Sequence, residues 1–177
     1  RGVSRMASLE IILERYEGPS LSEERKRELA ERKNDTYRRL LANMSPSDLT
    51  EEVRTTLEAL RSSGLKLGIG SSSKNAPFIL DRLGLGTYFD AVSDGNNITH
   101  SKPDPEVFLK GTGFLGVLPK ECLVVEDAVS GAEAGRCGGF PVACVGDASA
   151  AGAGDFNLTA FGQLIEVAAQ LREGATA

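Results

Sequence analysis

From residue 48 onward, short apolar runs alternate with segments whose apolar residues recur at helical spacing. The runs LKLGIG (65–70), FDAVSD (89–94), CLVVE (122–126) and FPVACVG (140–146) have the length and the residue types of strands. Helices are predicted around them at 51–63 and 76–83, at 106–114, from Gly131 and from Phe161. Strands that alternate with helices form βαβ units, so the sequence predicts an α/β fold with a parallel sheet covered by helices.

The first 47 residues contain no strand-like run. Apolar residues at helical spacing predict a helix over 7–16, which the turn residues EGPS (17–20) end. Ser20 lies three residues before Glu23, a capping-box pattern, and a long charged helix is predicted from there to about residue 44. We therefore expect an all-helical unit at 1–47 and an α/β core at 48–177, in which the stretch GDASAAGAGD (146–155) is a loop.

The charge balance restricts the partners that this chain can bind. Its 20 Lys and Arg oppose 25 Asp and Glu, a formal net charge of −5. This balance argues against a dedicated nucleic-acid or anionic-membrane surface, although local basic residues can still bind a small phosphorylated molecule. The three cysteines lack C-x-x-C spacing and no apolar window spans a bilayer. We expect a soluble, cytoplasmic protein with no nucleic-acid and no membrane partner.

Polar residues follow the predicted strands at the edge where parallel α/β sheets bind ligands. Ser71, Ser72, Ser73, Lys74 and Asn75 follow the first strand and lead directly into a helix. Hydroxyls, an ammonium and free helix N–H groups together suit a phosphate. The alternative is a Ser-rich helix cap with Lys74 in solvent.

Two further strand ends contain charged residues. Lys102 precedes Pro103 in a loop, and by itself it is equally well explained as an ordinary loop lysine. The lone His100 is interpreted as a polar loop residue, because the sequence shows no partners for metal binding by it. Glu126 and Asp127 end a buried strand, where ionised acids are costly without a positive partner, and their oxygens suit Mg²⁺. The alternative for this pair is favourable charge at a helix N-terminus.

The order of these residues resembles the haloacid dehalogenase superfamily. A Ser at one strand end, then Lys-Pro, then an acid pair, each separated by a βα unit, is similar to its second, third and fourth motifs. The resemblance implies a Rossmann-like core with an inserted helical cap. It also implies that Ser71 holds the transferring phosphoryl group, that Lys102 neutralises charge on the nucleophile and the phosphate, and that Glu126 and Asp127 complete a Mg²⁺ site.

The segments RGVSRMASLEIIL, AERKNDTYRRLL and SSSKNAPFILDRLGL resemble the β-phosphoglucomutase family within this superfamily. That resemblance implies a sugar phosphate as the ligand. Arg5 would clamp the phosphate that is not transferred, as a guanidinium can. From the residues alone, Arg5 and Lys33 look like surface charges. The full set that the resemblance places on the sugar phosphate is Gly2, Val3, Ser4, Arg5, Ser8 and Lys33 from the cap, and Ser71, Ser72, Ser73, Lys74, Asn75 and Lys102 from the core.

The superfamily's first motif, an apolar strand ending in D-x-D, is absent from the sequence. That strand supplies the nucleophilic and acid/base Asp residues and lies between the strands that end at Ser71 and Glu126. We therefore expect a fragment with an incomplete cap and a core that lacks its first strand. We expect the intact protein, a monomer, to interconvert β-glucose 1-phosphate and glucose 6-phosphate through a phospho-aspartyl enzyme and a bisphosphate. The alternatives are a sugar-phosphate phosphatase and a non-catalytic remnant.

Overall fold

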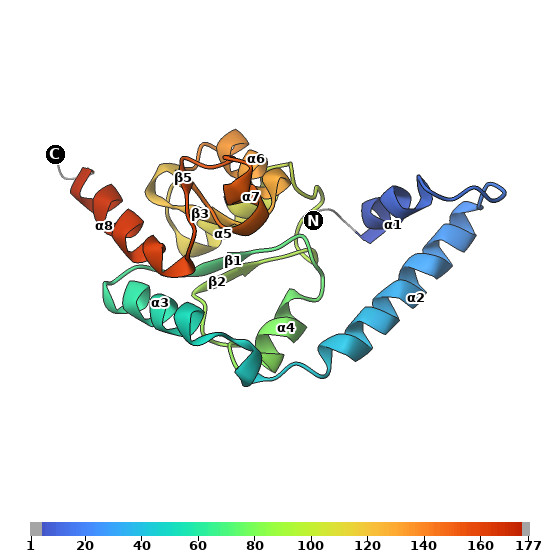
Figure 1. The fold of residues 1–177 in the computed structure, drawn as a ribbon, viewed down its shortest axis with the longest axis horizontal. Helices are drawn as coiled ribbons and strands as arrows, with labels where there is room; N and C mark the ends of the chain where they lie inside the picture. Colours follow the sequence, from blue (N-terminus) through green and yellow to red (C-terminus); the bar gives the residue numbers. More distant parts are fainter. Residues whose placement is uncertain (1–4, 175–177) are drawn as a thin grey trace.

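The structure is a computed structural model that describes residues 5–174, and it shows an α/β core with a pair of helices at one side (Figure 1). The strands are β1 (Gly68–Gly70), β2 (Ala91–Ser93), β3 (Val124–Glu126), β4 (Val142–Cys144) and β5 (Phe156–Asn157). All pairs between them are parallel. The predicted α/β class is confirmed.

The core helices alternate with these strands and cover both faces of the larger sheet. Helices α5 (Glu106–Leu115) and α6 (Val129–Cys137) contact each other, α5 packs on β1 and β2, and α6 packs on β3 and β4. Helix α3 (Glu51–Ser62) packs against α8 (Leu164–Gly174) and the short helix η3 (Phe161–Gln163). The remaining core helices are α4 (Ala76–Arg82), α7 (Gly146–Ala150), η1 (Pro46–Asp48) and η2 (Pro119–Glu121).

Strand β4 lies at the centre of the larger sheet and is buried on both faces. Successive side chains of a strand point to opposite faces, and here Val142 and Cys144 join one apolar cluster while Ala143 joins the other. The first cluster also contains Ala132 of α6 and Phe140, which precedes β4. The second cluster contains Leu164 and Val167 of α8. This is the continuous apolar run expected of a buried parallel strand.

The described strands form two separate sheets, β1–β2 and β3–β4–β5. Strand β1 pairs only with β2, and β3 pairs only with β4. Val125, in the middle of β3, is 38% exposed, which is unusual for the middle of a strand in this type of fold. These observations agree with a missing strand between β1 and β3, where the family resemblance places the strand that ends in D-x-D. The position of that strand stays a prediction.

Two helices, α1 (Arg5–Leu13) and α2 (Glu23–Leu41), pack on each other within the segment predicted to be the cap, and this pair is called the cap below. In Figure 1 they stand apart from the sheets, joined to α3 through η1. The prediction that Ser20 caps the N-terminus of α2 is wrong. Ser22 is the N-cap residue of this helix, and its Oγ accepts a hydrogen bond from the Arg25 N–H at 3.2 Å. That choice places Glu23 and Glu24 in the first turn, where the helix dipole favours acids.

The loop predicted at 146–155 is also corrected by the structure. It contains the short helix α7 and leads into the edge strand β5. Ala148 and Ala153 are buried there in the first apolar cluster, so small side chains permit close packing that the sequence pattern does not reveal. Within the described part of the chain, no helix is both long and apolar enough to cross a bilayer.

Candidate active site

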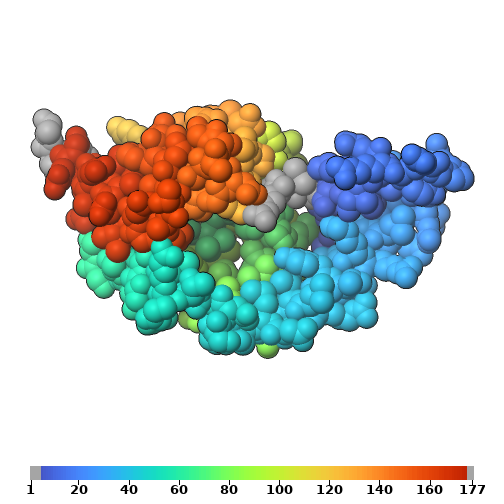
Figure 2. Space-filling view, in the orientation of Figure 1, coloured from blue at the N-terminus to red at the C-terminus, as the bar shows by residue number. Residues whose placement is uncertain are grey.

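A cavity of about 710 Å³ lies between the cap and the ends of the core strands. Figure 2 shows the molecule hollowed between the blue cap and the orange and red part of the core. The core lines the cavity with residues that follow β1 and β3 and with the loop that leads to α5. The predicted site residues on its wall are Arg5, Ser8, Lys33, Ser71, Ser72, Ser73, Lys74, Asn75, Lys102, Glu126 and Asp127.

The loop after β1 is held by its own hydroxyl groups. The N–H of Ser71 continues the sheet by donating to the Ser93 carbonyl at 2.9 Å. Ser71 Oγ accepts from the Ser73 N–H at 3.2 Å, and Ser73 Oγ accepts from the Asn75 N–H at 3.1 Å. The hydroxyl oxygens therefore hold the loop and do not cap the helix, because the N-cap of α4 is Asn75 and no side chain makes a capping hydrogen bond there. The hydroxyl protons can still be donated into the cleft.

Gly95 allows a second loop to lie against this one. A Cβ on Gly95 would come within 2.6 Å of the Ser72 carbonyl oxygen and 2.8 Å of the Lys74 nitrogen. Such distances are closer than real Cβ contacts, so only glycine fits without movement of the backbone. The sequence interpretation did not select Gly95, and the only signal for it was a glycine directly after a strand end.

Lys102 is buried in the floor of the cleft, with its side chain 6% exposed. Its ammonium forms an ion pair with Glu126 Oε1 and donates to the Gly70 carbonyl at 3.1 Å. It also lies 4.7 Å from the centre of the Phe108 ring. These partners compensate for its removal from water, so Lys102 links the end of β1 to the end of β3 rather than standing in solvent as a loop lysine would.

The two acids after β3 have different environments. Glu126 is buried, and its second oxygen accepts from the N–H groups of Asp127 (3.2 Å) and Ala128 (3.4 Å). Gly131 leaves room for it, since a Cβ there would lie 2.2 Å from the Glu126 carboxyl carbon. Asp127 is exposed on the wall of the cleft. Glu126 thus anchors the two residues that precede α6 and also neutralises Lys102, whereas the first turn of α6 itself contains no acidic residue.

The donor set fits a hard divalent cation. Mg²⁺ is commonly held by one or two carboxylates, with water and phosphate oxygens as its other ligands. Asp127 presents a carboxylate on the cleft wall, and Glu126, its neighbour in the sequence, also lines the cavity. These two residues are the ones that could hold the ion, with Glu126 shared with Lys102.

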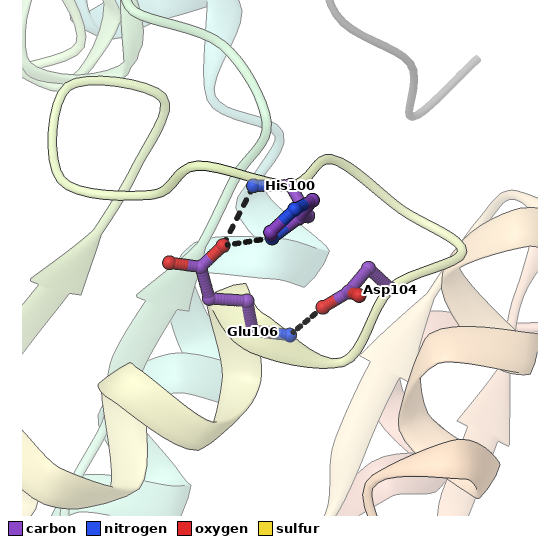
Figure 3. A group of neighbouring side chains, drawn as sticks. All are labelled: His100, Asp104 and Glu106. Atoms are coloured by element: carbon purple, nitrogen blue, oxygen red, sulfur yellow. Dashed lines mark hydrogen bonds and ion pairs between the residues drawn. The ribbon is translucent and has the colours of Figure 1, made fainter.

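His100 has the partners that the sequence did not reveal. Ligand atoms of His100, Asp104 and Glu106 lie within 4.8 Å of one another (Figure 3). Glu106 accepts from the N–H groups of Thr99 (2.9 Å) and His100 (2.6 Å), and Asp104 accepts from the Glu106 N–H at 2.9 Å. The expectation that His100 lacks such neighbours is therefore wrong. Their hydrogen bonds explain the group as an anchor of this loop on α5.

The cap faces the cleft with α1 and α2. Lys33 Nζ donates to Ser8 Oγ at 3.2 Å, so these two predicted residues are paired with each other. Asn75 Nδ2 donates to Asn34 Oδ1 at 3.0 Å and joins the cap to the core. Arg5 lies on the wall, whereas the predicted residues Gly2, Val3 and Ser4 fall outside the described residues.

Several residues of the cleft were not selected from the sequence. Asn34 and Tyr37 lie within a highly charged helix and resemble its solvated face, so only the three-dimensional arrangement identifies them. Val125 resembles an ordinary strand residue. The loop that leads to Lys102 also contributes polar groups. The additional lining residues are Asn34, Tyr37, Gly70, Gly95, Ile98, Thr99, Ser101, Val125, Ala128, Val145 and Phe161.

Comparison with known proteins identifies relatives whose names refer to phosphorylated sugars. The chain is 37% identical over 148 residues to β-phosphoglucomutase of Bacillus subtilis, covering 82% of this chain and 65% of that protein. It is 33% identical over 141 residues to a phosphorylated carbohydrates phosphatase of Thermotoga maritima, covering 78% and 62%. The chain thus spans less than two thirds of the length of either relative.

Structural comparison agrees with the sequence comparison. The crystal structure of β-phosphoglucomutase from Clostridium difficile superposes with a TM-score of 0.88 at 31% identity, covering 99% of this chain and 80% of that one. The family model for haloacid dehalogenase-like hydrolases matches residues 3–139. With the α/β core and the polar strand ends already described, this chain belongs to the haloacid dehalogenase-like hydrolase family.

Proposed function

We propose that this fold serves a Mg²⁺-dependent phosphomutase that interconverts β-glucose 1-phosphate and glucose 6-phosphate. The observation that supports it best is the convergence of Ser71, Lys102 and the acid pair Glu126–Asp127 on one cleft that the cap also lines. They come from the ends of β1 and β3 and from the loop before α5. The similarity to β-phosphoglucomutases over most of this chain supports the choice of substrate.

In this proposal the core residues hold and neutralise the transferring phosphoryl group. The Ser71 hydroxyl donates a hydrogen bond to a phosphoryl oxygen, because its oxygen already accepts from the loop N–H of Ser73. The Lys102 ammonium places positive charge at the floor of the cleft, where charge develops on the equatorial oxygens. Glu126 fixes that ammonium by the buried ion pair.

Bound Mg²⁺ would supply further charge neutralisation, and Asp127 and Glu126 are the residues that would hold it. The nucleophile is a separate requirement. The 177 residues contain no D-x-D sequence, and Glu126 is already paired with Lys102. A phospho-aspartyl step would therefore need a further Asp beside Ser71 and Glu126. A strand between β1 and β3, which belong to separate sheets among the described strands, would place one there.

The cap gives the mutase its specificity in this proposal. Arg5 on the cap wall would bind the phosphate that is not being transferred, as a guanidinium fork suits. Closure of α1 and α2 over the cleft would exclude water, so that a sugar hydroxyl receives the phosphoryl group instead of water.

A second candidate is a sugar-phosphate phosphatase with the same core. The relatives include the Thermotoga maritima phosphatase and, at 42% identity over 76 residues, the fructose-1-phosphate phosphatase YqaB of Escherichia coli. Both activities need the Ser71 and Lys102 contacts and differ only in the acceptor. A non-catalytic phosphate-binding protein is the third possibility, since the sequence itself has no D-x-D.

One experiment separates the three. The chain is mixed with a second polypeptide that contains an apolar strand ending in D-x-D. The mixture also contains Mg²⁺, β-glucose 1-phosphate and a glucose bisphosphate primer. The mutase proposal predicts glucose 6-phosphate in the mixture, and none when both Asp residues of the added strand are Asn. Release of inorganic phosphate in excess of glucose 6-phosphate would support the phosphatase instead. Ligand binding without turnover in every mixture would favour the non-catalytic protein.

A further inference from the structure

Tyr37 is an aromatic side chain of α2 that lines the cleft and is 44% exposed. It follows Lys33 by four residues and Asn34 by three, so the three lie on one face of the helix. The two polar neighbours have partners, Lys33 on Ser8 and Asn34 on Asn75. Among residues 5–174, no hydrogen bond or ring contact engages the Tyr37 side chain, so its ring is available to a ligand in the cleft.

The packing of α2 does not depend on this ring. The buried positions of the helix are Ala30 and Leu41, and Arg38 lies 5.1 Å from the centre of the Phe78 ring on α4. Tyr16 offers a comparison, because it is 49% exposed on the same cap but does not line the cleft. The position of Tyr37 therefore points to a ligand rather than to the stability of the cap.

The core side of the cleft supplies polar groups. The polar groups are those of the Ser71–Asn75 loop, Lys102 and Glu126, and the core also contributes the apolar side chains Ile98, Val125, Val145 and Phe161. Ligand sites commonly combine a few placed polar groups with an apolar or aromatic surface, and Tyr37 is the aromatic surface that the cap contributes here. A hexose has apolar C–H faces and a rim of hydroxyls, which match the flat ring and the phenolic hydroxyl of a tyrosine.

We propose that Tyr37 packs on the sugar ring of the bound phosphorylated hexose and determines specificity for the sugar. The inference rests on the proposed function, because it assumes that the phosphate occupies the Ser71–Asn75 side. The ligand's sugar ring would then extend from that loop toward α2. Tyr37 would contribute to recognition of the sugar and not to recognition of the phosphate.

The test compares glucose 6-phosphate with inorganic phosphate, using the 177-residue chain. Affinities are measured by calorimetry for the wild type, Tyr37→Ala, Tyr37→Phe and the control Tyr16→Ala. Loss of the ring contact should weaken binding of glucose 6-phosphate about tenfold in Tyr37→Ala and leave inorganic phosphate within about twofold. Tyr37→Phe should retain most of the affinity, and Tyr16→Ala should match the wild type for both ligands.

The ring resonances of Tyr37 give a second measurement. They should shift on addition of glucose 6-phosphate and stay in place with inorganic phosphate. Equal losses for both ligands in Tyr37→Ala, or no loss for either, would overturn the role of Tyr37 while leaving the proposed function intact. If the wild type binds neither ligand, the proposed function fails and this inference with it.

Discussion

Lys102 and Glu126 form the most buried ion pair of the described residues, with side chains 6% and 7% exposed. A buried pair contributes little net stability, yet removal of one member leaves the other charged and unpaired. Lys102→Met should therefore lower the free energy of unfolding by roughly 3–5 kcal/mol, measured by urea denaturation.

The control for this variant is an exposed pair. Arg54 and Glu58 lie 2.7 Å apart with side chains 47% and 54% exposed, so Arg54→Met should cost less than about 1 kcal/mol. The double variant Lys102→Met, Glu126→Gln should lose less than the sum of its single variants, because no uncompensated charge remains. Strict additivity would contradict the pairing described here.

Gly131 positions the Glu126 carboxylate. Since a Cβ would lie 2.2 Å from the Glu126 carboxyl carbon, Gly131→Ala must displace that group and should cost roughly 1–3 kcal/mol of unfolding free energy. Gly113 in α5 has nothing within 4 Å of its virtual Cβ, so Gly113→Ala should be neutral or stabilising by about 0.5–1 kcal/mol. If both variants denature alike, Gly131 has no such role.

The loop before α5 is joined to that helix by Glu106. Its carboxylate receives the Lys110 ammonium and the N–H groups of His100 and Thr99, which lower the pKa of Glu106 from 4.5 to about 2. Because folding lowers this pKa, ionised Glu106 stabilises the fold above about pH 4.5, and the contribution is lost as the pH falls toward 2.

Glu106→Gln tests this directly. The variant should be less stable than the wild type at pH 7, and the difference should shrink between about pH 4.5 and pH 2, where wild-type Glu106 becomes protonated. The measurement is the free energy of unfolding across that range, with an NMR titration of the carboxyl group. A constant difference at all pH values would show that the interaction is not the ionised one.

The strands and helices were predictable to different degrees. Strands β1 to β4 were predictable because each is part of a short apolar run. The position of the polar residues at the strand ends was predictable because ligands bind at the carboxyl ends of parallel strands. Helix α7 and strand β5 were missed, since Ala148 and Ala153 are buried by tertiary packing that small residues allow without an apolar signature. The helix start at Ser22 rather than Ser20 depended on a choice between two neighbouring serines.

The candidate site was predictable in the core and less so in the cap. Ser71 and Glu126 are unusual at the ends of strands, so the sequence alone draws attention to them. Lys102 lies in the loop between β2 and α5 and was selected only by its place in the order of the family's motifs. Asn34 and Tyr37 belong to a charged helix in which any residue can face solvent, and their place on the cleft depends on how α2 is held against the core, for example by the Asn75–Asn34 hydrogen bond. The spacing of residues along α2 does not show how this helix is placed relative to the core.

The 177 residues lack one part of the chemistry that is proposed for this fold. Phosphoryl transfer through an aspartyl intermediate needs a carboxylate aligned with the phosphorus, and no D-x-D occurs among the 177 residues. The chain alone should therefore give no glucose 6-phosphate above background from β-glucose 1-phosphate, even with Mg²⁺ and a bisphosphate primer. Turnover that Glu126→Ala abolishes would reveal a nucleophile among the residues present.

The central claim is that the cleft between the cap and the strand ends binds a sugar phosphate. The most direct measurement is a titration of the ¹⁵N-labelled chain with glucose 6-phosphate, followed by amide chemical shifts. The account predicts saturable shifts at Ser71 to Asn75 and at Lys102, weakened by Ser71→Ala and absent with glucose. Shifts confined to other parts of the molecule, or none at millimolar ligand, would contradict it.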